Sequence, residues 1–177
     1  AVVLFFFLLS TSSVVAKPSV TPVNSEVADA MGRVAVLYNG RICPLNTAAT
    51  EFVTKLCGKS TWEGLSANEI FLSWMIFYTE WEAQPIIRVK SQEVQKLLGI
   101  EGEWASVNDF YTSQHEYKLK DRVGDSTLSD AQCKALREVD EKVQVVTMFY
   151  NGEMLHLFPL PSQGGLKWYT PGSTELP

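Results

Sequence analysis

The order of hydrophobic and polar residues predicts a β-hairpin early in the chain. Residues 34–38 alternate in the manner of a half-buried strand. Asn39 and Gly40 follow, and both residue types tolerate the positive φ angles of a tight two-residue turn. Residues 41–43 then form the returning strand, which we expect Pro44 to end.

A capped amphipathic helix is predicted directly after this hairpin. Asn46 has a side chain that can accept hydrogen bonds from the first N–H groups of a helix, and Gly58 is a typical C-terminal stop. The hydrophobic residues between them recur at three- and four-residue steps on one face: Ala49, Phe52, Val53, Leu56 and Cys57.

A second helix is expected over residues 66–81, where Ser66 and Glu69 have the spacing of a capping box. The residues behind this box are so uniformly hydrophobic that almost no polar face remains. A helix of this kind is buried in a core, or it faces lipid or a partner. Core burial is the simpler interpretation, and a lipid or partner surface is the alternative.

The longest helix signal covers residues 126–150. Its hydrophobic residues form a one-sided stripe, which is typical of core packing: Leu136, Val139, Val143 and Val146. We expect the opposite side to face solvent, because it carries these charged residues: Lys134, Arg137, Glu138, Glu141 and Lys142.

Shorter elements fill the rest of the chain. We predict a strand over 85–90, a helix capped by Ser91 with Val94, Leu97 and Leu98 turned inward and Gly99 as its stop, and a single turn capped by Ser106 with Phe110 buried. The alternating segment 153–160 predicts a strand, and Gly164-Gly165 would turn the chain so that residues 167–169 pair back onto it.

These elements together predict an α+β fold. We expect a mainly helical single domain with small antiparallel hairpins over residues 34–177, after a linker at 17–33 that is rich in Pro, Ser and Val. The length of 177 residues suits one domain, with or without a membrane appendage.

The first sixteen residues are hydrophobic at twelve positions and carry no charge. This run is shorter than the roughly 20 residues that span a bilayer. It is therefore expected to be the end of a transmembrane helix whose start is missing, since the chain begins with Ala1, or the apolar part of a signal peptide. Both hypotheses place the following domain outside the cytoplasm; a buried helix is the third alternative.

Composition and charge narrow the function classes. Hydrophobic residues make up 46% of the chain and charged residues 20%, which is enough for a sizeable core. The formal net charge of −5 argues against a nucleic-acid-binding protein, because such proteins usually present a basic face.

Reactive and metal-binding residues are few. Cys43, Cys57 and Cys133 are an odd number without a Cys-x-x-Cys spacing, so they predict neither a zinc site nor a disulfide framework, and their pairing stays open. His115 and His156 are 41 residues apart, and neither has a second potential ligand within four residues. A metal pair or a haem contact would therefore have to be assembled by the fold.

Several motifs resemble, in order and spacing, the extracytoplasmic region of System II cytochrome c synthases, in which ResB-like and CcsA-like parts are fused. They are NGRICPLNTAATEFVTKLCGKS, GLSANEIFLSWM, LLGI, SVNDFY, VDEKVQVVTMFYNGEMLHLFPLP and KWY. The matches extend over residues 37–170. In that family, a segment of the form NGR-x-x-P-x-x-T opens the region that precedes the CcsA-like membrane part.

The resemblance implies a role in cytochrome c biogenesis on the periplasmic side of the inner membrane. The parent protein would carry haem and attach it to apocytochrome c, as a holocytochrome c synthase. The haem-handling residues of the family belong to the CcsA-like part, so no catalytic residue, metal ligand or cofactor is assigned to this chain. Its expected partners are apocytochrome c, the membrane and the membrane part of the same protein.

On this hypothesis, the region is a scaffold or partner-docking domain. Its candidate contact residues are Asn39, Gly40, Arg41 and Pro44, which could equally form a purely structural turn. Two alternatives remain: a free-standing secreted binding module, and a thiol enzyme that uses Cys43 or Cys57 with a histidine.

Overall fold

The structure, a computed structural model, describes residues 20–170 and 173–174. The hydrophobic segment 1–16, which we interpret as a membrane-helix end or a signal segment, lies outside the described residues. Among the helices that are described, none combines the length and the hydrophobicity needed to cross a bilayer.

The described residues form six α-helices and one 3₁₀ turn. The helices are α1 (Ser25–Gly32), α2 (Leu45–Cys57), α3 (Ala67–Ile76), α4 (Tyr78–Glu82), α5 (Gln92–Leu98) and α6 (Asp130–Tyr150), and the 3₁₀ turn η1 is Asn108–Phe110.

The strands form four two-stranded antiparallel sheets in the described part of the chain. They pair β1 (Ala35–Tyr38) with β2 (Arg41–Pro44), β3 (Thr61–Trp62) with β4 (Leu65–Ser66), β5 (Ile87–Arg88) with β6 (Trp104–Ala105), and β7 (Phe158–Ser162) with β8 (Gly165–Tyr169). The predicted α+β class, mainly helical with small antiparallel hairpins, is confirmed.

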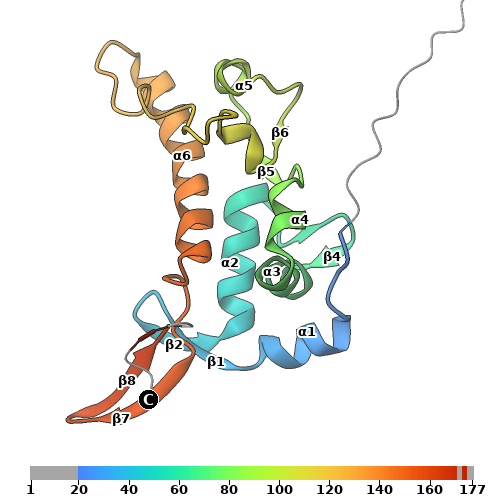
Figure 1. The fold of residues 1–177 in the computed structure, drawn as a ribbon, viewed down its shortest axis with the longest axis vertical. Helices are drawn as coiled ribbons and strands as arrows, with labels where there is room; N and C mark the ends of the chain where they lie inside the picture. The colour runs from blue at the N-terminus through green and yellow to red at the C-terminus, as the bar shows by residue number, and fades with distance from the viewer. Residues whose placement is uncertain (1–19, 171–172, 175–177) are drawn as a thin grey trace, which may run out of the picture.

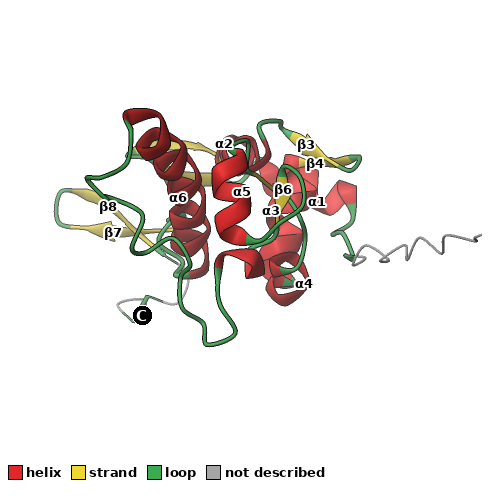
Figure 2. Cartoon of the chain, turned by 90° about the horizontal axis from the view of Figure 1, so that it is seen from above, coloured by secondary structure: helices red, strands yellow, loops and turns green. Residues whose placement is uncertain are grey.

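Helix α2 lies in the middle of this arrangement (Figure 1). Helix α3 packs against it on one side and the long helix α6 on the other, while α1 runs along the end that α2 starts from. Seen from above, the β7–β8 hairpin projects beyond α6, away from the other helices (Figure 2).

The first hairpin forms as its sequence predicts. Asn39 and Gly40 join β1 to β2 with φ angles of 50° and 72°, the left-handed conformation that such a turn needs. The helix that follows begins two residues earlier than expected. Pro44 is its N-cap, and Asn46 instead lies inside the first turn, where its side-chain amide donates to Asn68 Oδ1 over 3.4 Å. Gly58 ends the helix in the left-handed conformation, as predicted.

Part of the expected linker is helical. Within 17–33, Asn24 caps helix α1 by accepting from the backbone N–H groups of Glu26 and Val27. Gly32 lies so close to α3 that a Cβ there would be 2.5 Å from the Asn68 amide nitrogen. The linker hypothesis is therefore wrong for Ser25–Gly32, which packs against α2 and α3.

The hydrophobic segment after Ser66 is only partly buried. The capping box of Ser66 and Glu69 is present, and the first part of α3 lies in the core, as predicted. The helix breaks at Phe77, whose φ of −116° and ψ of 48° are not helical, and α4 continues in a new direction. Met75 and Tyr78, on either side of this break, are exposed.

Helix α6 has the expected hydrophobic stripe. Ser129 forms a capping box with Gln132, and the four hydrophobic residues of the stripe are buried. Lys142, expected in solvent, is only 5% exposed. Its Nζ donates to the backbone oxygen of Arg88 over 2.6 Å, and burial lowers its pKa.

Leu97 on α5 also departs from expectation, since it is exposed rather than turned inward.

The C-terminal strand begins later than its alternation predicts. Met154 and Leu155 are both buried, so the segment does not alternate between two faces there. Backbone bonds join Leu37 and His156 in both directions, over 3.0 and 3.3 Å. Strand β7 starts only at Phe158 and pairs with β8 as expected.

Aromatic rings make up the centre of the core. The Phe52 ring meets the rings of Phe71 and Trp74 edge-on at 5.4 Å and stacks on that of Phe149 at 4.9 Å. Trp74 in turn stacks on Trp81 at 5.5 Å. Helices α2, α3, α4 and α6 thus share one ring cluster.

We expect Phe52→Ala to lower the free energy of unfolding by about 3–5 kcal/mol, because it removes the ring that touches three others and leaves a cavity. Phe158→Ala is the matched control, since Phe158 is exposed on β7 and should change stability by no more than about 0.5–1 kcal/mol. Urea unfolding of both variants measures the difference. Equal losses would contradict a core centred on Phe52.

Candidate functional site

Two pockets lie on either side of the C-terminal end of α6. The first, here the aromatic pocket, has a volume of about 510 Å³ and is lined by residues of α3, α4 and the end of α6. The second, here the hairpin groove, has a volume of about 530 Å³ and is lined by the β1–β2 hairpin, α6 and residues 153–156. Both lie in the size range of small-molecule and peptide sites.

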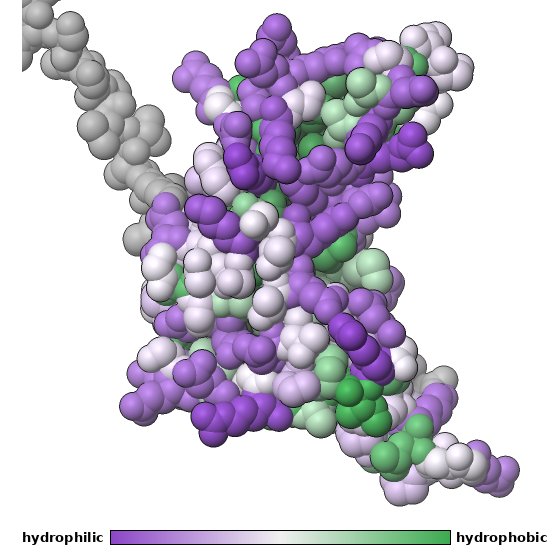
Figure 3. Space-filling model, turned by 180° about the vertical axis from the view of Figure 1, so that it is seen from behind, coloured by the Kyte–Doolittle hydropathy of each residue, from purple (hydrophilic) through white to green (hydrophobic). Residues whose placement is uncertain are grey.

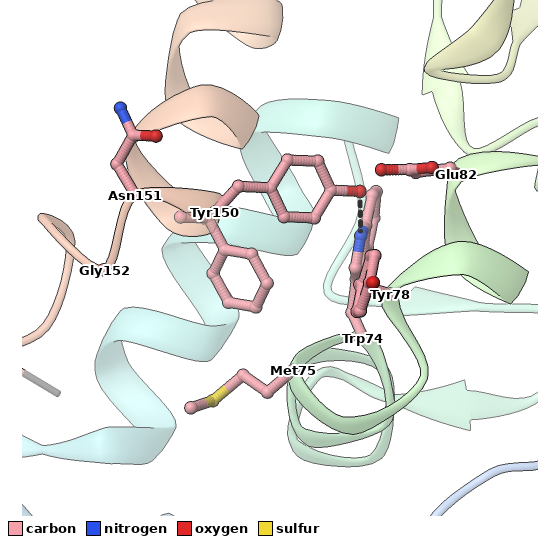
Figure 4. A pocket seen from close by; sticks show the side chains of 8 residues that line it. Trp74, Met75, Tyr78, Glu82, Tyr150, Asn151 and Gly152 are labelled. Carbon is pink, nitrogen blue, oxygen red and sulfur yellow. Dashed lines mark hydrogen bonds between the residues drawn. The ribbon is translucent and has the colours of Figure 1, made fainter. Parts of the chain in front are cut away.

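The aromatic pocket is walled by two tyrosines. The ring centroids of Tyr78 and Tyr150 are 6.4 Å apart at an angle of 72°. Trp74 forms the buried floor, and its indole Nε1 donates to Tyr150 Oη over 2.7 Å. Figure 4 shows this bond, with the Glu82 carboxylate directed toward the same hydroxyl from α4. The pocket therefore joins aromatic faces to one carboxylate.

The Tyr150 phenol is held in its neutral form. Burial is the largest cause that raises its pKa; the bond from Trp74 acts in the opposite direction, and the negative charge of Glu82 raises the pKa further. The hydroxyl is thus a neutral polar group at the pocket wall across the physiological pH range.

The hairpin groove combines hydrophobic and thioether side chains with the polar residues Asn39, Glu153 and His156. Met148 on α6 is 45% exposed, whereas Met154, which also lines the groove, is buried. The backbone bonds between Leu37 and His156 fix the hairpin to the segment after α6. Figure 3 shows hydrophobic surface at the base of the projecting β7–β8 hairpin, the end of the molecule at which these elements meet. Flexible methionine side chains adapt to partners of varied shape.

The structure brings together two of the four predicted contact residues. Asn39 and Gly40 line the hairpin groove at the tip of the turn. Arg41 instead points along the outside of α2 and pairs with Glu51 over 2.6 Å. Pro44 lies at the other end of β2, beside a separate cleft between α1 and α2. Whether any of these residues contacts a partner stays a prediction.

The three cysteines are free thiols. Cys57 is buried, and its Sγ lies 3.2 Å from the backbone oxygen of Val53, while Cys43 and Cys133 are half-buried. Across residues 20–170 and 173–174, no group of three or more His, Cys, Asp or Glu side chains has a metal-binding arrangement.

The aromatic pocket was not predicted from the sequence. Its residues come from two segments, 74–82 and 149–152. We interpreted the aromatic side chains of the first segment as core and assigned no role to those of the second. The distribution of charged residues nevertheless distinguishes the two regions that form the pocket. Residues 60–87 and 143–166 contain glutamates but no lysine or arginine, although the chain has fifteen basic residues.

No protein-family model matches this chain. The chain is 37% identical over 135 residues to the protein NrfI of Wolinella succinogenes. The aligned part is 73% of this chain and 15% of NrfI. The chain is therefore a distant homologue of NrfI and spans about a seventh of the length of that relative.

We expect the stability of the protein to fall as the pH rises above 10.0, the ordinary pKa of tyrosine. Tyr150 keeps its proton in the folded protein at a pH where the same phenol ionises in the unfolded chain, so ionisation favours unfolding. The variant Tyr150→Phe, although less stable at pH 8 because Trp74 loses its acceptor, should show a shallower fall. Denaturant unfolding between pH 8 and 11 measures how the free energy of unfolding of each protein depends on pH. Parallel curves for the unchanged protein and for Tyr150→Phe would contradict this expectation.

Proposed function

We propose that this chain is a periplasmic partner-docking region of a cytochrome c assembly protein. The observation that carries the proposal is the distant homology of this chain to NrfI. This relation suggests a role in cytochrome c biogenesis. The alignment extends over most of the chain rather than over a single motif. The ordered motifs that resemble the fused ResB-like and CcsA-like synthases support the same assignment.

The docking partner in this proposal is an unfolded segment of apocytochrome c, and the docking site is the hairpin groove. The groove is open, is lined by two methionines, and includes the predicted contact residues Asn39 and Gly40. A hydrophobic surface with thioether side chains suits a flexible polypeptide, because these side chains adjust to several sequences. Haem transfer and attachment would belong to the membrane part of the parent protein.

The rigid attachment of the groove supports a positioning role. The β1–β2 hairpin is tied to the segment after α6 by the Leu37–His156 bonds, and α6 is held in the core through Phe149. A docked segment would therefore be held in a fixed position relative to the rest of the domain. Such positioning lowers the entropic cost of a later bond-forming step elsewhere.

Cross-linking in the intact protein in its native host tests this proposal. With a photoreactive residue at position 148, we expect a covalent product with apocytochrome c, because Met148 is exposed in the groove. Met31 on α1 is the matched control, since it is 43% exposed but lies outside the groove. Equal products from both positions, or none from position 148, would contradict docking in the groove.

A charge placed in the same groove should lower the yield of cytochrome c. We expect Met148→Glu to reduce the amount of covalently haem-bound cytochrome several-fold, because an unpaired carboxylate opposes hydrophobic contact. Met31→Glu should leave that amount unchanged. Haem staining of cell extracts measures both. Normal cytochrome levels in a strain that lacks the whole gene would overturn the assignment and favour a secreted binding module.

A further inference from the structure

We propose that the aromatic pocket binds an alkylammonium group, either a small quaternary ammonium compound or the charged end of a lysine side chain. This inference does not rest on the proposed function, because it uses a different pocket and only the chemistry of its lining. The inference rests on three observations: the accessible tyrosine rings, the carboxylate beside them, and the lack of basic residues in the segments that form the pocket.

The rings are placed so that one cation can meet two π faces. Tyr78 is 54% exposed and Tyr150 37% exposed, so both rings are accessible from the pocket side. Their centroids are 6.4 Å apart at 72°, which makes the two rings the adjoining walls of a corner. A cation in that corner can lie within the roughly 6 Å of each centroid at which cation–π attraction acts.

The ring of Tyr150 is held in position. Trp74 Nε1 donates to the Tyr150 hydroxyl over 2.7 Å. The Tyr150 ring also meets the Phe149 ring edge-on, with 6.0 Å between the two centroids. Trp74 itself is fully buried and stacked on Trp81. The wall is therefore fixed before a ligand arrives, which reduces the entropic cost of binding.

Glu82 supplies the negative charge. Its side chain is half-buried at the pocket, and its charge is close enough to contribute to the raised pKa of Tyr150. In the part of the chain that the structure describes, none of the ion pairs includes Glu82. A half-buried carboxylate without a cationic neighbour is stabilised by a cation from a ligand.

The sequence around the pocket is consistent with this ligand class. The pocket is formed by parts of residues 60–87 and 143–166, and neither segment contains a lysine or an arginine that could occupy it. The whole chain has a formal net charge of −5. An approaching cation is therefore attracted, and a carboxylate or phosphate ligand would meet repulsion from Glu82. A purely hydrophobic ligand would leave this charge unpaired.

Titration calorimetry of the purified chain with four probes tests the inference. The first pair is choline and its neutral isostere 3,3-dimethylbutan-1-ol. The second pair is N-acetyl-lysine methylamide and the corresponding norleucine amide. We expect each cation to bind at least about tenfold more tightly than its neutral partner, because only the cation gains from the rings and the carboxylate. Tighter choline binding would indicate a small quaternary ligand, and tighter lysine binding a polypeptide side chain.

Two substitutions connect this binding to the pocket. We expect Glu82→Gln and Tyr78→Leu each to weaken binding of the preferred cation by about 3- to 10-fold. Glu101→Gln, which changes an exposed carboxylate outside both pockets, should have no effect. Circular dichroism and thermal unfolding verify that each variant is folded. Equal affinity for charged and neutral probes, no binding at millimolar concentration, or equal effects of Glu82→Gln and Glu101→Gln would overturn the inference.

Discussion

The packing of Phe149 against α2 and α3 is the contact on which both pockets depend. Its ring stacks on Phe52 at 4.9 Å and meets Phe71 edge-on at the same distance. These partners are 97 and 78 positions away in the sequence, so the contact can form only when the C-terminal part of the chain folds back onto the first helices. It buries large apolar rings and gains from their edge-on geometry, which together make aromatic clusters strong organisers of a core.

The direction of Phe149 sets the directions of its two neighbours. Successive residues of an α-helix point about 100° apart, so a helix that turns Phe149 inward must turn Met148 to one side and Tyr150 to the other. Met148 thus reaches the hairpin groove and Tyr150 the aromatic pocket. One partly buried residue near the end of α6 therefore fixes two surfaces of different chemistry, one with thioether groups and one with aromatic rings and a carboxylate.

Local signals in the sequence predicted the elements well where the determining residues are neighbours. The Asn39-Gly40 turn and the capping box of Ser66 depend on contacts within four positions, and both form as expected. The helical repeat of α6 likewise specified its buried stripe. Hydrogen bonds across such short separations are available in the unfolded chain, which is why their patterns can be recognised from sequence.

The errors arise where distant residues decide the outcome. Helix α1 has a weak local signal, and its packing depends on Gly32, which allows the Asn68 side chain of α3 to approach closely. Lys142 is buried because a backbone oxygen of Arg88 accepts from its Nζ. Periodicity assigns Lys142 to the charged face but contains no information on this acceptor, which is 54 positions away.

The difference between contacts of neighbouring residues and contacts of distant residues also explains why only part of the candidate site could be predicted. Asn39 and Gly40 were found because a tight turn is a local pattern, whereas their place beside Met148 follows from the folding of α6. The aromatic pocket has no local motif at all, because its walls come from α4 and from the end of α6. The absence of basic residues in both contributing segments is the one property that sequence could have given, and it acquires meaning only once the structure shows that the segments meet. A charge pattern shared by two separated segments is therefore a useful indication that they form one surface.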